Sequence, residues 1–106
     1  MLEAAHVCLE FVDKKKRKDF ENDKMLGFAT IRALEIFGEA AANISKSFQQ
    51  KHPQIEWRAI IGMRNRLIHA YFNIDYDIVW QALKSEIPKI IPELEKLINN
   101  LEKEIG

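Results

Sequence analysis

Apolar residues recur at helical spacing along nearly the whole chain, and no segment shows the alternation that a half-buried strand needs. We expect helices over residues 2–12, 20–44, 55–72, 76–84 and 86–104, with a short turn over 48–51. Consecutive helices joined by short connections pack side by side in opposite directions. The pattern therefore predicts an all-α fold, an antiparallel four- to five-helix bundle, in one domain over residues 1–106.

Capping residues place the ends of these helices. Asp19 is expected to cap the long second helix, and Asp75 the fourth. Ser47 is expected to cap the short turn, and Ser85 the last helix. Pro92 lies inside that last helix and should bend it.

The second and last helices each carry one apolar stripe, which predicts the face that each buries. Arg32, Glu39 and Asn43 lie at the margin of the stripe on the second helix. Arg32 is expected to join a local ion pair. Glu39 has two equal interpretations, a local ion pair or a partner for Arg64 on the next helix. The second helix is expected to bury Met25, Ala29, Ala33, Ile36, Ala40 and Ile44, flanked by Leu26 and Phe37, and the last helix Ile87, Ile90, Ile91, Leu94, Leu97, Ile98 and Leu101.

The third helix holds the pattern around which the rest is arranged, because Arg64 lies in the middle of its apolar stripe. A guanidinium cannot lose its charge and is costly to bury without a partner. The stripe must therefore open at Arg64 onto a cleft, a subunit contact or an anion. Its apolar members are Trp57, Ile60, Ile61, Leu67, Ile68, Tyr71 and Phe72.

Another face of this helix carries Asn65 and His69, four residues apart, with Arg58 and Gly62 one turn or more before them. Arg64 and His69 are five residues apart, so they point roughly 140° away from each other. Either the long Arg64 side chain bends toward His69, or two copies of the helix face each other. Gly62 lacks a Cβ and would permit such a close approach.

Composition narrows the function classes. The 106 residues include 16 basic and 16 acidic side chains, so no overall positive charge attracts nucleic acid. Any RNA binding must depend on local clusters, either the run Lys14–Lys18, which is typical of a solvated loop, or Arg58, Arg64 and Arg66. No apolar run approaches the length of a membrane span, and no signal peptide is present. We therefore expect a cytoplasmic protein without membrane contact.

Cysteine and histidine usage argues against disulfide and metal chemistry. Cys8 is the only cysteine, which excludes an intramolecular disulfide and fits a reducing compartment. Its apolar neighbours predict a buried core residue and not a nucleophile. His6 and His52 are expected at the surface, and with His69 they give no metal-ligand spacing. The sequence predicts a site without metal or cofactor.

The segment Arg64-Asn65-Arg66-Leu67-Ile68-His69-Ala70-Tyr71 resembles the Arg-x4-His-x-Tyr signature of HEPN-domain ribonucleases. The segments 55–63 and 75–80 look like the HepT-like toxin branch of that family, and residues 38–40 and 23–26 fit the same pattern. The likeness covers nearly the whole chain. Relatives that it resembles usually carry several residues before the first helix, which predicts a shortened first helix here.

The resemblance implies a dimeric toxin that cleaves RNA without metal, with Arg64 and His69 as the catalytic pair at a cleft between two protomers. These residue types suit the reaction, because histidine titrates near neutrality and a guanidinium binds phosphate bidentately. Asn65 would support the site, and Arg58 and Arg66 would contact RNA. DNA is not expected as a substrate, because the ribose 2′-OH would be the nucleophile.

The resemblance also implies a mode of neutralisation. In HepT-like proteins the tyrosine of the signature accepts AMP from ATP through a cognate minimal nucleotidyltransferase antitoxin, which points to Tyr71. A bulky anionic nucleotide beside Arg64 would occupy the phosphate site and repel RNA.

Two other functions stay open from the residues. The chain could be a non-catalytic helical subunit that dimerises and binds a nucleotide or a nucleotidyltransferase, with Arg64 holding phosphate. It could also be a purely structural dimer, with Arg64 paired to Glu39 and His69 at a helix C-terminus, where a cation is favoured. Spacing alone favours a structural role for both residues, and the family resemblance reverses that order.

Overall fold

Every regular element is helical in the computed structural model, which describes residues 1–69 and 74–105. The all-α prediction is thereby confirmed. In chain order the elements are α1 (Leu2–Val12), α2 (Arg17–Asn22), α3 (Lys24–Ala42), α4 (Lys46–Lys51), α5 (Trp57–Ile68), α6 (Tyr76–Gln81), the π-helical turn η1 (Ala82–Glu86) and α7 (Ile87–Ile105).

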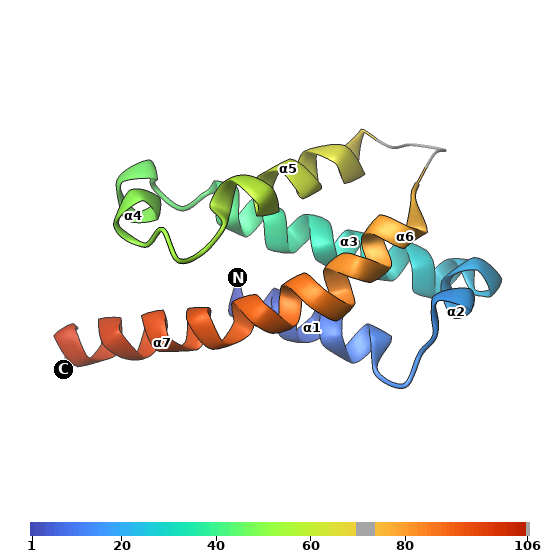
Figure 1. The fold of residues 1–106 in the computed structure, drawn as a ribbon, viewed down its shortest axis with the longest axis horizontal. Helices are drawn as coiled ribbons and strands as arrows, with labels where there is room; N and C mark the ends of the chain where they lie inside the picture. Colours follow the sequence, from blue (N-terminus) through green and yellow to red (C-terminus); the bar gives the residue numbers. More distant parts are fainter. Residues whose placement is uncertain (70–73, 106) are drawn as a thin grey trace.

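Helix α3 lies at the centre of the bundle and packs against α1 on one side and α5 on another. The elements α6, η1 and α7 follow one another without a break, and we call them the C-terminal rod (Figure 1). Its α7 part packs on α1. The molecule measures 47 × 28 × 18 Å, and the short helices α2 and α4 lie toward opposite ends of its long axis (Figure 1).

One hydrophobic core joins α1, α3, α5 and the rod. Cys8 and Ala41 are completely buried, as predicted for Cys8. Thr30 is also fully buried, and its hydroxyl donates to the carbonyl of Leu26 at 2.7 Å, which satisfies its polar atom. The predicted stripe of the last helix is confirmed, because it buries Ile87, Ile91, Leu94 and Leu97 and half-buries its other members.

The second predicted helix is two helices, so the expectation for Asp19 was wrong. Asp19 lies inside the first turn of α2, where it accepts from the Lys16 N–H at 2.7 Å. The N-cap of α3 is Asp23, which accepts from the Leu26 N–H at 3.1 Å. Both aspartates suit a helix N-terminus, and each stabilises the start of a different helix, Asp19 that of α2 and Asp23 that of α3.

The predicted stripe of α3 was also partly wrong. Met25 is 81% exposed and Ile36 is 43% exposed. The buried line instead includes Gly27, Thr30 and Gly38, three residues that an apolar pattern does not count. Because α3 is covered from several sides, small residues and one satisfied hydroxyl fill its tightest contacts.

Two further helix starts differ from expectation, and one is confirmed. Ser45 caps α4 and accepts from the Phe48 N–H at 3.2 Å, so Ser47 is not the cap. Ser85 caps no helix, because η1 carries the chain from α6 into α7. Asp75 caps α6 as predicted and accepts from the Asp77 N–H at 2.9 Å. Among the helices that the structure describes, none is long and apolar enough to cross a membrane.

Candidate active site on helix α5

Arg64 leaves α5 where that helix packs tightly against Gly38 of α3. A Cβ added to Gly38 of α3 would overlap Arg64 Cβ and would lie 2.8 Å from Arg64 Cγ. Only a glycine can occupy this position without moving one of the two helices. The absence of a side chain at Gly38 therefore leaves the space that the stem of Arg64 occupies.

The described residues do not satisfy every donor of the Arg64 guanidinium. Its Nε is buried and has no hydrogen-bond partner among the residues described. The side chain as a whole is half-buried, so the charge is not sealed in a dry interior. Leaving a buried donor without a partner costs about 1–3 kcal/mol. This cost fits the expected cleft, and it favours an anion or a second chain at this position.

His69 lies at the end of the same helix in a different setting. It is the C-cap of α5, its side chain is exposed, and its N–H donates to the carbonyl of Leu67. Arg66 and Asn65 are exposed as well. A Cβ added to Gly62 would meet nothing within 4 Å. This side of α5 is therefore open along much of its length.

Arg64 and His69 thus belong to different sides of α5. The helix is regular from Trp57 to Ile68, so the 100° step per residue applies up to its end. Arg64 packs on α3, whereas Gly62 and Arg66 line a cavity on another side, and His69 is the next position along that line. No hydrogen bond or ion pair joins Arg64 to His69 among the described residues. The structure does not bring the pair together within one chain.

Of the two interpretations of Glu39, the structure contains the local ion pair, with Arg32 as the partner. Arg32 donates to Glu39 at 3.3 Å and to Glu35 at 3.2 Å. The two carboxylates raise the pKa of the Arg32 guanidinium, with the hydrogen bond to Glu35 as the first cause. No ion pair within the described parts of the chain links Glu39 to Arg64. The local ion pair predicted for Arg32 is present.

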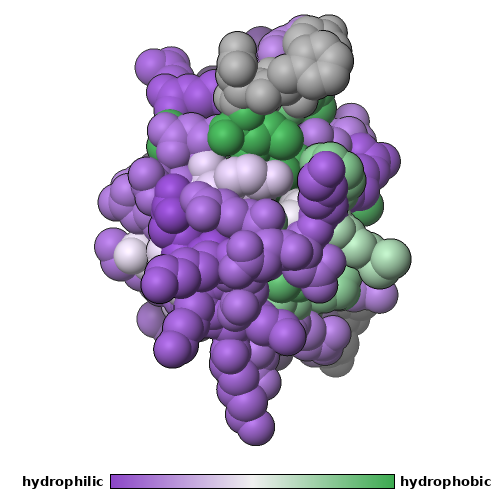
Figure 2. All heavy atoms as spheres, turned by 90° about the vertical axis from the view of Figure 1, so that its right-hand side faces the viewer, coloured by the Kyte–Doolittle hydropathy of each residue, from purple (hydrophilic) through white to green (hydrophobic). Residues whose placement is uncertain are grey.

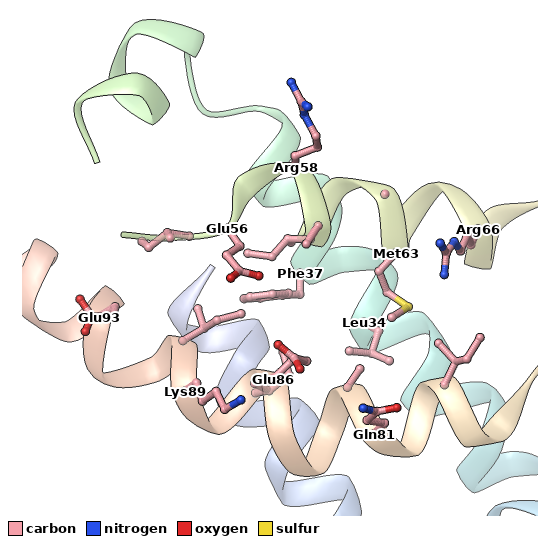
Figure 3. A pocket seen from close by; sticks show the side chains of 18 of the residues that line it. Leu34, Phe37, Glu56, Arg58, Met63, Arg66, Gln81, Glu86, Lys89 and Glu93 are labelled. Atoms are coloured by element: carbon pink, nitrogen blue, oxygen red, sulfur yellow. The ribbon is translucent and has the colours of Figure 1, made fainter. Parts of the chain in front are cut away.

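A groove of about 700 Å³ lies between α5 and the C-terminal rod. Figure 3 shows α5 along one wall and the rod along the other, with Leu34 and Phe37 of α3 between them. Met63 points into the groove, while Arg58 points away from it (Figure 3). The rod contributes Gln81, Glu86, Lys89 and Glu93 to the lining.

The sequence did not predict that residues of the rod line this groove. Their polarity looked like an ordinary solvated helix face, and no motif links them to α5. A signal was present on α5 itself, where Ala59 precedes Gly62 by three residues and Gly62 precedes Arg66 by four, so that two small residues share this face. Small residues on a helix face indicate that something approaches closely or that space stays open.

Other predicted features have simple outcomes. Tyr71 and Phe72 lie outside the described residues. Burial raises the pKa of the Cys8 thiol to about 12, so it stays protonated near neutral pH and is a poor nucleophile.

His6 is exposed and lies 4.0 Å from Glu95. His52, which was expected at the surface, is half-buried, and its ring lies tilted against that of Phe48 with ring centres 4.4 Å apart. No cluster of three or more metal-ligating side chains occurs in the described part of the chain.

Comparison with known proteins gives a consistent set of relatives. The family model "HepT-like: Ribonuclease HepT-like" matches residues 1–97. The "Probable ribonuclease HepT" of Thermococcus cleftensis is 45% identical over 90% of this chain and 86% of its own length. The "Putative RNase MJ1380" of Methanocaldococcus jannaschii is 44% identical over 90% and 87%. The "Putative RNase TTE0752" of Caldanaerobacter subterraneus is 41% identical over 92% and 88%. No solved structure matches the chain.

Proposed function

Because this chain belongs to the HepT-like ribonuclease family, we propose that it cleaves RNA without a metal ion, with Arg64 and His69 as catalytic residues. The observation that carries the proposal is the Arg64 guanidinium, whose stem packs against Gly38 and whose buried Nε has no partner among the described residues. A phosphodiester would supply acceptor oxygens and the opposite charge. The guanidinium donors suit two oxygens of one phosphate.

The reaction would use the substrate's own ribose. His69 accepts the proton of the 2′-OH while the 2′-oxygen forms a bond to the adjacent phosphorus. The bond from phosphorus to the 5′-oxygen breaks, and that oxygen takes up a proton from the imidazolium. Arg64 stabilises the added negative charge on the phosphate oxygens. The products are a 2′,3′-cyclic phosphate and a free 5′-hydroxyl.

Two copies of the chain would assemble the site. Arg64 and His69 lie on different sides of α5, so a partner subunit can supply the residue that one chain lacks. The open surface at Gly62 would let a second α5 approach closely. In the homodimer, Asn65 would orient the imidazole or contact the phosphate, and Arg58 and Arg66 would contact the RNA strand.

The biological setting that we propose is a toxin–antitoxin system. A cognate minimal nucleotidyltransferase antitoxin would transfer AMP to Tyr71, two residues after His69. Added nucleotide phosphates would compete with RNA for Arg64. Mass spectrometry of the chain after co-expression with the product of the neighbouring gene should find AMP on Tyr71. An unmodified Tyr71 in a neutralised complex contradicts this part of the proposal.

A cleavage assay tests the enzyme itself. Purified protein is incubated with labelled RNA in EDTA beside the His69→Ala variant and a His52→Ala control. We expect wild type and the control to cleave, and His69→Ala to be about 10²–10⁴-fold slower, the usual contribution of a general acid–base group. Equal, slow degradation by all three proteins would contradict the proposal. It would favour the non-catalytic partner-binding subunit.

A further inference from the structure

Five consecutive cations, Lys14–Lys18, cover the connection between α1 and α2 and the first two residues of α2, and we call this segment the basic turn. The side chains of Lys14, Lys15, Lys16 and Lys18 are exposed. Within the described parts of the chain, none of these four lysines takes part in an ion pair. Asp13 and Asp19 flank this segment, and its five cations still outnumber these two neighbouring carboxylates.

The backbone of this basic turn is held in a defined shape. Lys14 adopts the left-handed conformation, with φ of 59°. The Lys15 N–H donates to the carbonyl of Val12 at 3.0 Å, and the Lys16 N–H donates to Asp19 at 2.7 Å. These bonds fix where the lysine stems start, so less backbone entropy is lost when a polyanion binds.

The remaining cation ties the turn to the segment that follows the signature helix. Arg17 forms ion pairs with Glu21 and with Asp77. These two carboxylates raise the pKa of the Arg17 guanidinium, with the hydrogen bond to Asp77 as the first cause. Asp77 lies in the first turn of α6, against which α2 packs. Arg17 is therefore used as a structural anchor, and its four lysine neighbours stay available.

The basic turn and the end of α5 consequently lie at the same end of the molecule. Asp75 is six positions after His69 in the sequence, and so short a chain spans at most about 20 Å. Figure 1 shows both in the right-hand half of the molecule, with the C-terminal end of α5 along the upper edge and the connection from α1 to α2 along the lower edge. Figure 2 views this end and shows a largely hydrophilic surface, with apolar atoms gathered mainly at its upper part.

We propose that Lys14, Lys15, Lys16 and Lys18 form a second RNA-contact surface, which binds backbone phosphates of the substrate strand outside the cleavage site. This inference rests on the proposed ribonuclease function. Lysine ammonium groups bind phosphates as point charges without reading sequence, and such contacts release counterions and depend steeply on salt. An anionic lipid surface is the competing polyanion. RNA is favoured because Arg17 fixes the turn beside the helix that follows His69.

The test compares two variants with equal loss of charge. In the turn variant, the four exposed lysines become glutamine, which keeps length and polarity. The control variant loses four exposed lysines at the opposite end of the long axis, on α4 and on the distal part of α7 (Figure 1). The control substitutions are Lys46→Gln, Lys51→Gln, Lys96→Gln and Lys103→Gln. Circular dichroism melting curves establish that both variants fold.

The probe is a labelled single-stranded 2′-O-methyl RNA, whose blocked 2′-oxygen prevents cleavage. Its affinity is measured by fluorescence anisotropy from about 50 to 200 mM salt. We expect the turn variant to bind roughly tenfold or more weakly at low salt, with the salt slope reduced by about 0.7 for each phosphate that the variant no longer neutralises. The control should stay within about twofold of wild type. Cleavage of unmodified RNA should show a raised KM and an unchanged kcat.

Each outcome separates this inference from the proposed function. If wild type neither binds nor cleaves RNA, the ribonuclease proposal fails and takes the inference with it. If wild type cleaves RNA and the turn variant matches the control in affinity and slope, only the inference is overturned. It is also overturned if the substitutions abolish binding to vesicles of anionic phospholipid and leave RNA binding unchanged.

Discussion

The two sides of α5 differ in how tightly they are covered. Toward α3, Gly38 and Arg64 approach so closely that a single added methyl group would collide with the arginine stem. Toward the C-terminal rod, the helix borders a groove of about 700 Å³, and a methyl group at Gly62 would meet nothing. The covered side confines the stem of Arg64, while the open side leaves Arg66 and His69 exposed. One helix thus has a tightly packed side, which carries Arg64, and an accessible side.

The largest effect on RNA cleavage should come from replacing the arginine on the covered side of α5, and replacing one on the open side provides the comparison. Arg64→Ala is expected to slow RNA cleavage about 10²–10³-fold, because it removes a fixed donor to the phosphate. Arg66→Ala should chiefly raise KM, since that side chain is exposed. Steady-state kinetics on one defined RNA measures both variants. A greater loss of kcat in Arg66→Ala than in Arg64→Ala would reverse the roles assigned to the two sides.

The next effect concerns the two glycines. Gly38→Ala should destabilise the fold by about 1–3 kcal/mol, because the new Cβ must push α3 and α5 apart. Gly62→Ala is the matched control on the same pair of helices, and it should stabilise the isolated chain by about 0.5–1 kcal/mol. Chemical denaturation followed by circular dichroism gives both values. Equal effects of the two substitutions would mean that the covered and open sides do not differ.

Gly62→Ala also tests the open side as a contact surface. If a second α5 packs against Gly62, the added methyl group should weaken the dimer and slow cleavage while leaving the chain folded. Analytical ultracentrifugation across a range of concentrations measures the dimer. A dimer of unchanged affinity would place the partner on some other surface.

The smallest effect is expected for Glu39. Its carboxylate binds exposed Arg32 at 3.3 Å, and surface pairs of this kind contribute about 0–1 kcal/mol. Glu39→Gln should therefore change both stability and cleavage only slightly, and Arg32→Gln should behave in the same way. If Glu39→Gln slows cleavage as much as Arg64→Ala, that result would favour the alternative interpretation, in which Glu39 is a partner of Arg64.

The sequence predicted the helical elements better than the contacts between them. Helix α1 and the buried stripe of α7 were predicted because their apolar residues repeat at regular spacing. The division between α2 and α3 was missed, since Asp19 and Asp23 are equally good caps and only tertiary packing selects between them. The π-helical turn that replaced the expected start at Ser85 has no signal in a simple period of 3.6 residues.

The candidate site shows the same limit. The position of Arg64 on an apolar stripe and its divergence from His69 followed from helix geometry alone. The close approach of Gly38 to the Arg64 stem did not follow from the sequence, because a glycine on another helix leaves no mark in an apolar pattern. The wall of the groove formed by the rod was also invisible, since its charged residues resemble any solvated face. Pairwise contacts between distant segments require coordinates.

The most direct test of a site shared between two chains is complementation. Arg64→Ala and His69→Ala proteins carrying different affinity tags are mixed, and heterodimers that carry both tags are isolated and assayed on RNA. The shared arrangement predicts that one of the two sites in each heterodimer is intact, so about half of the wild-type activity returns. Heterodimers as inactive as either parent would show that both residues must come from the same chain, and that α5 does not act in pairs.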